Sequence, residues 1–162
     1  TDAGKAAMAL YRQHPETPED IAKEPSSEKD GMLFGRSGEG ENHRALRLWV
    51  HDNPGTLFPK LVGCVAETEY LLPSADRIDV LISTLDERLA VEAKSRDSNE
   101  ADLARGIYQC VKYRAVLRAA TNDEAIAVHA CLVTEVPLPL FLQEEARRLH
   151  IETKVVPADR KL

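Results

Sequence analysis

Three charged residues, Asp79, Glu92 and Lys94, have the types and the spacing needed for metal-assisted chemistry on a phosphate ester. Asp79 interrupts a short apolar segment, RIDVLI (77–82), and Glu92 and Lys94 end the next one, LAVEAKS (89–95). Side chains alternate between the two faces of a strand, so Glu92 and Lys94 are expected to point the same way. A hairpin between the two strands would bring Asp79 beside them. Two carboxylates and an ammonium on one patch of sheet would hold a hard divalent cation, which predicts hydrolysis of phosphodiester bonds.

Ordinary structural roles compete with this interpretation. A buried carboxylate without a partner is costly, so Asp79 needs either a metal or an ion pair with a neighbour such as Arg77 or Arg88. The Glu92-x-Lys94 pair is a weak signal by itself, because charged side chains at strand ends are usually solvated. The combination of all three residues with the helix that follows is more specific, and it favours a functional site.

That helix, DLARGIYQCVKYRAVLRA (102–119), presents three polar residues on one face. Arg105, Gln109 and Lys112 are spaced i, i+4 and i+7, which places them together on a helix surface. The surrounding stretch 88–118 carries seven Lys or Arg and four Asp or Glu, a net charge of +3. We therefore expect Arg105 and Lys112 to contact a nucleic-acid backbone, which is mainly electrostatic work. A solvated polar stripe is the alternative.

The hydrophobic periodicity predicts the elements that must position these residues. Three consecutive strands followed by a helix and a further strand imply a mixed sheet with helices on both faces. The predicted order is α-β-β-β-α-β-α-β: a helix at 41–51, strands at 64–72, 77–83 and 88–94, a helix at 98–119, a strand at 125–135, a helix opened by 137–139 that runs to about 150, and a strand at 151–156.

With these elements in place, the chain resembles the PD-(D/E)XK (restriction-endonuclease-like) nuclease superfamily. Asp79, twelve intervening residues and then Glu92-Ala93-Lys94 are similar to its central motif. Gln109-x-x-x-Tyr113 in the following helix is similar to the motif of RecB-type members. The resemblance covers residues 38–156, about three quarters of the chain. One departure is that Ile78 precedes Asp79 where the motif has a proline, and that proline is often missing in the superfamily.

The resemblance implies an α/β restriction-endonuclease-like core, αβββαβ with an added αβ, and a role for each motif residue. Asp79 and Glu92, with the backbone carbonyl of Ala93, would hold one Mg²⁺ or Mn²⁺. Lys94 would stabilise the transition state or help to deprotonate the attacking water. Gln109 would orient that water or a phosphate. Catalysis would then be assigned to Asp79, Glu92, Lys94 and Gln109.

The first helix offers one more candidate ligand. Many superfamily members place a Glu at its start, which corresponds here to Glu41, whereas RecB-type members place a His, and His43 follows two residues later. We favour Glu41 because carboxylate oxygen suits Mg²⁺. Stabilisation of the helix N-terminus by an acidic residue is the alternative role for Glu41.

Length and composition indicate one soluble globular domain with an extension. The chain has 162 residues, which suits a single domain, and we divide it into an N-terminal helical extension and linker (1–37) and a nuclease-like domain (38–162). Its longest apolar runs are too short to span a bilayer and no charged-then-apolar leader opens it, which predicts a cytoplasmic protein without a membrane partner. Three scattered cysteines without a CxxC pair predict reduced buried thiols rather than a zinc site or disulfides.

The functional expectation is a metal-dependent DNA nuclease acting in repair, recombination or defence, with an endonuclease favoured over an exonuclease. The alternative is a non-catalytic DNA-binding or assembly module that keeps the nuclease fold, which the net charge of −6 and the lack of a basic arm favour. The chain could also be a C-terminal module of a larger protein. Because superfamily members often dimerise to cut both strands, a homodimer is a further expectation.

Overall fold

The computed structural model describes residues 40–160 of the chain. The predicted extension and linker at 1–37 lies outside these residues. The elements follow one another in the predicted order, with one added short helix: α2 (Glu41–Asp52), α3 (Pro54–Leu57), β1 (Val65–Leu71), β2 (Arg77–Ser83), β3 (Glu87–Lys94), α4 (Glu100–Ala120), β4 (Ala127–Thr134), α5 (Leu140–Arg148) and β5 (Glu152–Val155).

Five strands form one mixed sheet in the order β1-β2-β3-β4-β5. The β1–β2 and β2–β3 pairs are antiparallel, and the β3–β4 and β4–β5 pairs are parallel. Each parallel connection passes through a helix, α4 or α5, as a crossover between parallel strands requires. The expectation of a mixed sheet is confirmed.

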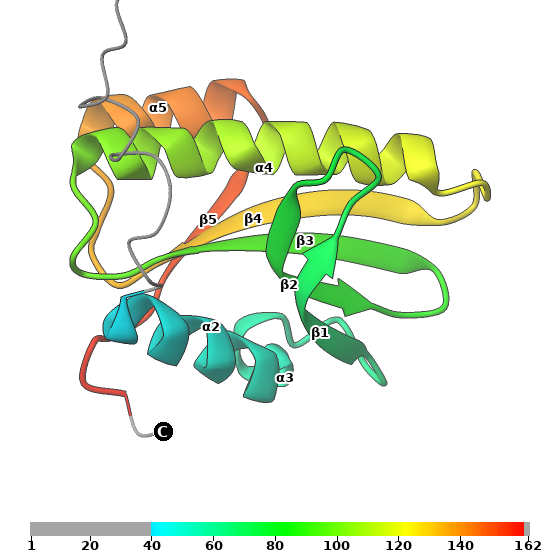
Figure 1. Cartoon of the computed structure of the whole chain (residues 1–162), viewed down its shortest axis with the longest axis horizontal. Coiled ribbons are helices and arrows are strands. Elements are labelled where there is room, and N and C mark those ends of the chain that lie inside the picture. The colour runs from blue at the N-terminus through cyan, green and yellow to red at the C-terminus, as the bar shows by residue number, and fades with distance from the viewer. Residues whose placement is uncertain (1–39, 161–162) are drawn as a thin grey trace, which may run out of the picture. The chain divides into compact units, whose positions relative to one another are not determined.

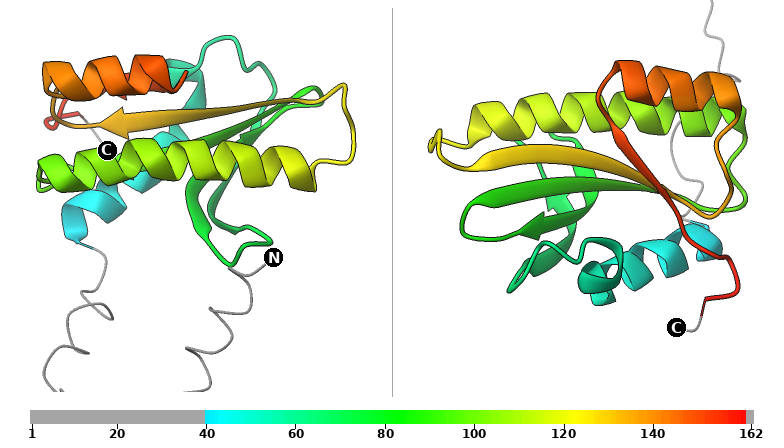
Figure 2. Two further views of the ribbon diagram at one scale, coloured as in Figure 1. Left: turned by 90° about the horizontal axis from the view of Figure 1, so that it is seen from above. Right: turned by 180° about the vertical axis from the view of Figure 1, so that it is seen from behind.

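Helices cover both faces of this sheet (Figures 1 and 2). The helix α2, with α3, packs on one face through Leu46 and Val50, against strand residues such as Val91 and Val133. The helices α4 and α5 lie on the other face, where Ile107 is among the residues that pack on the sheet. Two buried apolar layers therefore fix the distance of α2 and of α4 from the strands that carry the candidate site.

The helix α4 begins where its sequence provides a capping box. The Asn99 side chain accepts from the backbone N–H of Asp102, and the Asp102 carboxylate accepts from the backbone N–H of Asn99. These two bonds satisfy backbone donors that have no partner inside the first turn of the helix. The cap fixes the start of α4, so the position of Gln109 along the helix follows from the local sequence.

The ladder between β1 and β2 is irregular beside Asp79. Thr68 pairs with Val80 and Tyr70 pairs with Ile78, so Glu69 and Asp79 lie opposite each other between these pairs. Glu69 has a φ of 53°, an uncommon conformation for a residue with a side chain. The β2–β3 ladder ends at this point, with Val80 opposite Val91. The irregularity therefore lies where β2 separates from β3.

The three cysteines are reduced. Cys110 and Cys131 are buried and Cys64 is half-buried, all three as free thiols. Within residues 40–160, no helix combines the length and the apolar character needed to cross a bilayer.

Candidate active site

Asp79 lies at the point where strands β2 and β3 separate. Its Oδ2 accepts a hydrogen bond of 2.8 Å from the backbone N–H of Ala93, a donor on the adjacent strand. Its Oδ1 lies 3.2 Å from Nε2 of His43 on α2, and its side chain is 15% exposed. Neither Arg77 nor Arg88 forms the ion pair with Asp79 that was the alternative to a metal. Arg77 donates to the carbonyl of Glu69, and Arg88 donates to the carbonyls of Thr84 and Glu87 in its own turn. Asp79 thus joins two strands and a helix through its carboxylate.

A continuous chain of hydrogen bonds runs from β3 to α4. It passes through the side chains of Glu92, Lys94, Gln109 and Tyr113. The Lys94 ammonium donates to Glu92 Oε1 over 2.7 Å and to Gln109 Oε1 over 3.1 Å. The Gln109 amide donates in turn to the Tyr113 hydroxyl over 3.0 Å. The side chains of Glu92 and Lys94 are only 4% and 13% exposed, so this chain is largely removed from water. The predicted same-face arrangement of Glu92 and Lys94 and the predicted approach of Gln109 are both present.

The Glu92 carboxyl is held in an environment that disfavours its negative charge. Burial is the main cause and the charge of Asp79 is the second, and together they raise the pKa of Glu92 to about 7 against an ordinary value of 4.5. The nearby Lys94 ammonium acts in the opposite direction without cancelling these effects. Two neighbouring carboxylates that repel each other in a buried site would be relieved by a bound cation.

Tyr113 is neutral in this environment. Burial raises the pKa of its hydroxyl well above the ordinary range, and the charge of Glu92 adds to the effect. Its ring is buried against the sheet at 3% exposure, while its oxygen accepts from Gln109. Tyr113 therefore both packs in the core and orients the Gln109 amide.

The first helix brings His43 to the site. Glu41 lies in the first turn of α2 with an exposed side chain, where an acidic residue stabilises the helix N-terminus. The favoured ligand Glu41 thus lies at the exposed start of α2, and the contact with Asp79 comes from the alternative, His43. His43 and Arg47 are four residues apart, so both lie on one face of α2.

Arg47 makes the second contact between α2 and the β1–β2 hairpin, a contact that the sequence interpretation missed. Its Nη1 lies 3.1 Å from Glu69 Oε1, and its side chain is 9% exposed. His43 and Arg47 therefore meet Asp79 and Glu69, the two residues that face each other where the β1–β2 ladder is irregular. The helix is attached to the hairpin on two successive turns, which fixes the direction from which His43 approaches.

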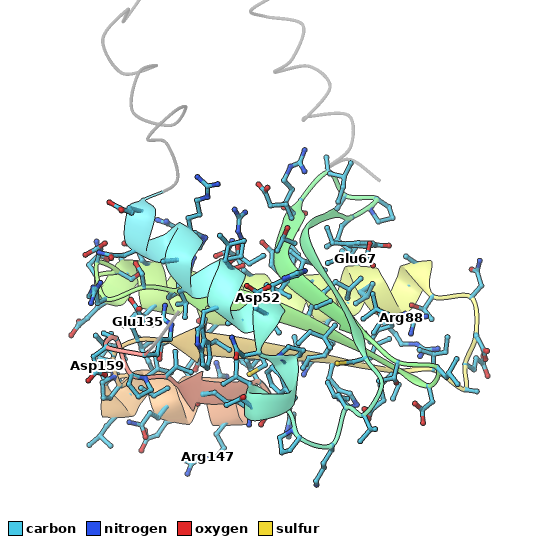
Figure 3. The ribbon with its side chains drawn as sticks, turned by 90° about the horizontal axis from the view of Figure 1, so that it is seen from below. Asp52, Glu67, Arg88, Glu135, Arg147 and Asp159 are labelled. Carbon is cyan, nitrogen blue, oxygen red and sulfur yellow. The ribbon has the colours of Figure 1, made fainter. Side chains whose placement is uncertain are left out.

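Glu135, labelled in Figure 3, lies directly after β4 and contacts the end of the strand that carries Lys94. Its backbone N–H donates to the carbonyl of Lys94 over 3.2 Å, and its carboxylate accepts from the N–H of Arg96 over 2.8 Å. The same carboxylate pairs with Arg160, whose guanidinium lies 5.5 Å from the ring centre of Trp49 on α2. This buried contact links β3, β4 and α2 at one end of the domain.

The two predicted nucleic-acid contacts, Arg105 and Lys112, are exposed on α4. Arg105 pairs with Asp102 one turn earlier at 3.0 Å, and its side chain is 64% exposed. Lys112 reaches across to Asp76, in the turn between β1 and β2, at 2.8 Å, and this hydrogen bond lowers the pKa of Asp76. Both side chains are accessible to a ligand, and both are already paired with a carboxylate.

The donors around Asp79 suit a hard divalent cation without forming a complete cage. Among residues 40–160, no three acidic, histidine or cysteine side chains converge as a ready-made metal site. Asp79 Oδ1 and His43 Nε2 are 3.2 Å apart, close to the separation of about 3.0 Å expected for adjacent ligands at octahedral bond lengths. Mg²⁺ keeps several waters and takes few protein ligands, so this sparse donor set fits it.

Comparison with known proteins agrees with this architecture. No protein-family profile matches the sequence, and a search of curated proteins gives no match. Among solved structures, a repair endonuclease from Pyrococcus abyssi is similar, with a TM-score of 0.50, 15% identity and 76% of this chain covered. SfsA from Pyrococcus furiosus in complex with Ca²⁺ is similar at a TM-score of 0.40, with 21% identity and 62% of this chain covered.

This chain spans about half of each of these two proteins, since the matches cover 50% of the endonuclease and 50% of SfsA. At such low identity the likeness concerns the fold. A five-stranded mixed sheet with α2 on one face and α4 and α5 on the other, in a chain that superimposes on a repair endonuclease, is an α/β restriction-endonuclease-like core.

Proposed function

We propose that this domain is a metal-dependent nuclease that hydrolyses phosphodiester bonds in DNA. The observation that carries the proposal is the convergence of side chains from β2, β3 and α4. Hydrogen bonds join Lys94 to Glu92 and to Gln109. Asp79 accepts from the backbone N–H of Ala93, the residue between Glu92 and Lys94. Buried charges are costly, and proteins concentrate them where a ligand or a reaction uses them. The similarity in fold to a repair endonuclease supports the same class of function.

Asp79, Glu92 and the carbonyl of Ala93 would hold the cation, Mg²⁺ or Mn²⁺, together with His43 in place of Glu41. A cation held there supplies Lewis-acid stabilisation of the negative charge that develops on the phosphate. The imidazole of His43 is a nitrogen ligand, which favours Mn²⁺ over Mg²⁺ more than an all-oxygen set would.

Lys94 would act on the substrate directly. Its ammonium lies between Glu92 and Gln109, so it can release one of these acceptors and donate to a phosphate oxygen without moving its side chain far. A positive group fixed where charge develops stabilises the transition state more than the ground state. Gln109, held by Tyr113, would orient the attacking water or the phosphate.

The RecB-type version of the site is part of this proposal. Two features support it: the hydrogen bond between Gln109 and Tyr113, and the contact of His43 rather than Glu41 with Asp79. Arg105 and Lys112, exposed on the same helix as Gln109, would contact the DNA backbone. Endonucleolytic action by a homodimer, which would place two such sites on opposite strands, is part of the proposal and is tested by light scattering of the free and DNA-bound protein.

The proposal is tested by incubating the protein with supercoiled plasmid in Mg²⁺ or Mn²⁺, beside reactions containing EDTA. We expect nicked or linear plasmid with metal and none with EDTA or with Lys94→Ala. Lys60→Ala is the matched control, because Lys60 is an exposed lysine remote in sequence from the site and should leave cleavage unchanged. Cleavage that persists in Lys94→Ala would contradict the assignment of this lysine.

A non-catalytic DNA-binding module is the second candidate. The net charge of −6 and the pairing of both Arg105 and Lys112 with carboxylates favour weak, local DNA contact over a broad basic surface. DNA binding measured by fluorescence anisotropy, without cleavage of plasmid, linear, single-stranded or branched DNA under any metal, would favour this candidate.

A further inference from the structure

Gly106 lies at the point where α4 passes over the side chain of Lys94. A methyl group at this position would lie 3.0 Å from Cε and 3.2 Å from Cγ of Lys94, and 2.9 Å from Cδ1 of Leu132. The contact with Leu132 is too short to be kept without a shift, and the Lys94 chain has to give by a few tenths of an ångström. The absence of a side chain at Gly106 thus leaves a channel along the helix surface, and the aliphatic part of Lys94 occupies it.

A glycine here has a cost that local structure does not explain. Gly106 is in the interior of a 21-residue helix, and glycine in a helix interior is about 1 kcal/mol less favourable than alanine. Its backbone is ordinary right-handed helix, so no left-handed conformation requires glycine. The remaining reason is space, and the side chains that need the space are Lys94 and Leu132.

The channel determines where the Lys94 ammonium can lie. Gln109 follows Gly106 by three residues and lies on the same side of α4, so a side chain that runs over Gly106 reaches Gln109 Oε1. The backbone of Lys94 lies on β3, two residues after Glu92, and the Glu92 carboxylate is the second acceptor of the Lys94 ammonium. The long, flexible Lys94 side chain is in this way restricted to one path before a substrate binds. It is 13% exposed along that path.

We propose that Gly106 is a positioning residue for Lys94, which holds the ammonium between Glu92 and Gln109 by leaving room for the aliphatic chain. The proposal rests on the proposed catalytic role of Lys94 for its functional consequence, but the steric coupling between the two residues stands apart from that role. An alanine at 106 would strengthen the helix locally and, at the same time, displace the Lys94 chain by a few tenths of an ångström.

A double-mutant cycle on stability tests the coupling without using activity. Gly106→Ala is made in the wild-type, Lys94→Ala and Lys94→Met backgrounds, and urea unfolding midpoints are measured in EDTA. Lys94→Met keeps a long unbranched chain over Gly106 and removes the charge, whereas Lys94→Ala removes both. The contact with Leu132 is common to all three backgrounds and cancels in the comparison, so only the contact with the residue at 94 remains.

We expect Gly106→Ala to lower the midpoint clearly in wild type and in Lys94→Met, and to leave it unchanged or raise it in Lys94→Ala. Equal shifts in all three backgrounds would overturn the proposal, because the Lys94 chain would then not be the obstacle. If Gly106→Ala alone fails to fold, the same cycle is measured in a Leu132→Val background, where the nearest neighbour of the new methyl group is shorter.

Cleavage assays then test the functional consequence. We expect Gly106→Ala to lower kcat several-fold with KM almost unchanged, because the Lys94 chain has to shift by a few tenths of an ångström, less than the displacement near 1 Å that can cost about 100-fold. Gly55→Ala is the matched control, since a methyl group there meets nothing within 4 Å and should leave kcat unchanged. A Gly106→Ala protein that is coupled to Lys94 in the cycle and yet cleaves at the wild-type rate would refute the positioning role.

The two proposals fail in different ways. A wild-type protein that never cleaves DNA removes the proposed function, while the stability cycle still reports whether Gly106 and Lys94 are coupled. Normal cleavage by the wild type with an additive cycle removes the role of Gly106 and leaves the proposed function in place.

Discussion

Replacing Glu92 by glutamine should stabilise the metal-free protein at pH 8. The side chain is 4% exposed, and its burial and the charge of Asp79 raise the pKa to about 7 against an ordinary 4.5. Glutamine has nearly the same shape and can still accept from Lys94, but it never carries the negative charge. Glu92→Gln thus resembles the wild type with its carboxyl protonated at every pH.

The magnitude follows from the two pKa values. One pKa unit corresponds to about 1.4 kcal/mol, so ionising Glu92 in the folded protein costs about 3 kcal/mol more than in the unfolded chain. Between pH 4.5 and about 7 the folded state holds more protons on this carboxyl than the unfolded state does. Stability should therefore fall as the pH rises through this window, and the loss should be complete above it.

The assay is urea unfolding of wild type and Glu92→Gln in EDTA at several pH values from 4.5 to 8.5. We expect equal stability near pH 4.5 and an advantage of about 2–3 kcal/mol for Glu92→Gln at pH 8. The matched control is Glu124→Gln, an exposed glutamate in the loop before β4, which should show no such pH-dependent difference. A Glu92→Gln protein that is less stable than wild type at pH 8 would refute the electrostatic reasoning.

Adding the cation should remove most of the stability difference between the two proteins. A ligand that binds only the folded state at 100 times its Kd adds about 2.7 kcal/mol of stability. Wild type should gain this from Mg²⁺ or Mn²⁺ at pH 8, and Glu92→Gln should gain much less because one charged ligand is lost. Equal gains in both proteins would remove Glu92 from the set of metal ligands.

Three further predictions test the neighbouring residues. His43→Ala should raise the Kd for Mn²⁺ about 10–100-fold and Glu41→Ala should change it less than about twofold, measured by calorimetry, and the reverse ranking would restore Glu41 as the helix ligand. Tyr113→Phe removes the acceptor of the Gln109 amide, so it should cost about 1 kcal/mol in urea unfolding and lower kcat less than Lys94→Ala does. Lys112→Ala should weaken DNA binding equally for all sequences and reduce the salt dependence by about one counterion in anisotropy titrations, and an unchanged salt slope would exclude a phosphate contact.

The sequence predicted the fold closely because its apolar residues follow clear periods. The strand expected at 77–83 is β2 at Arg77–Ser83, and β3 begins one residue earlier than expected, at Glu87. The helix expected from residue 98 begins at Glu100, since the Asn99 cap determines its first turn. The first helix, expected at 41–51, ends at Asp52, and Pro54 starts the short helix α3 because proline suits a first helical position.

The chain by itself determined the chemistry of the candidate site: one acid in a strand, Glu-x-Lys in the next, and Gln109 in the helix that follows. Alternation in strands and the helical repeat are local properties, so they place Glu92 with Lys94 and Gln109 with Tyr113 before any tertiary contact is known. The contacts of these residues in the fold agree with that placement.

Tertiary structure alone decided how these pieces meet. Whether His43 or Glu41 reaches Asp79 depends on how α2 is rotated on the sheet, which its buried face and its contacts with the hairpin determine. The sequence also does not predict that β2 separates from β3 at Asp79, or that Lys94 passes over Gly106. Both depend on distances between elements, and those distances are set by the packing of buried side chains that lie far apart along the chain.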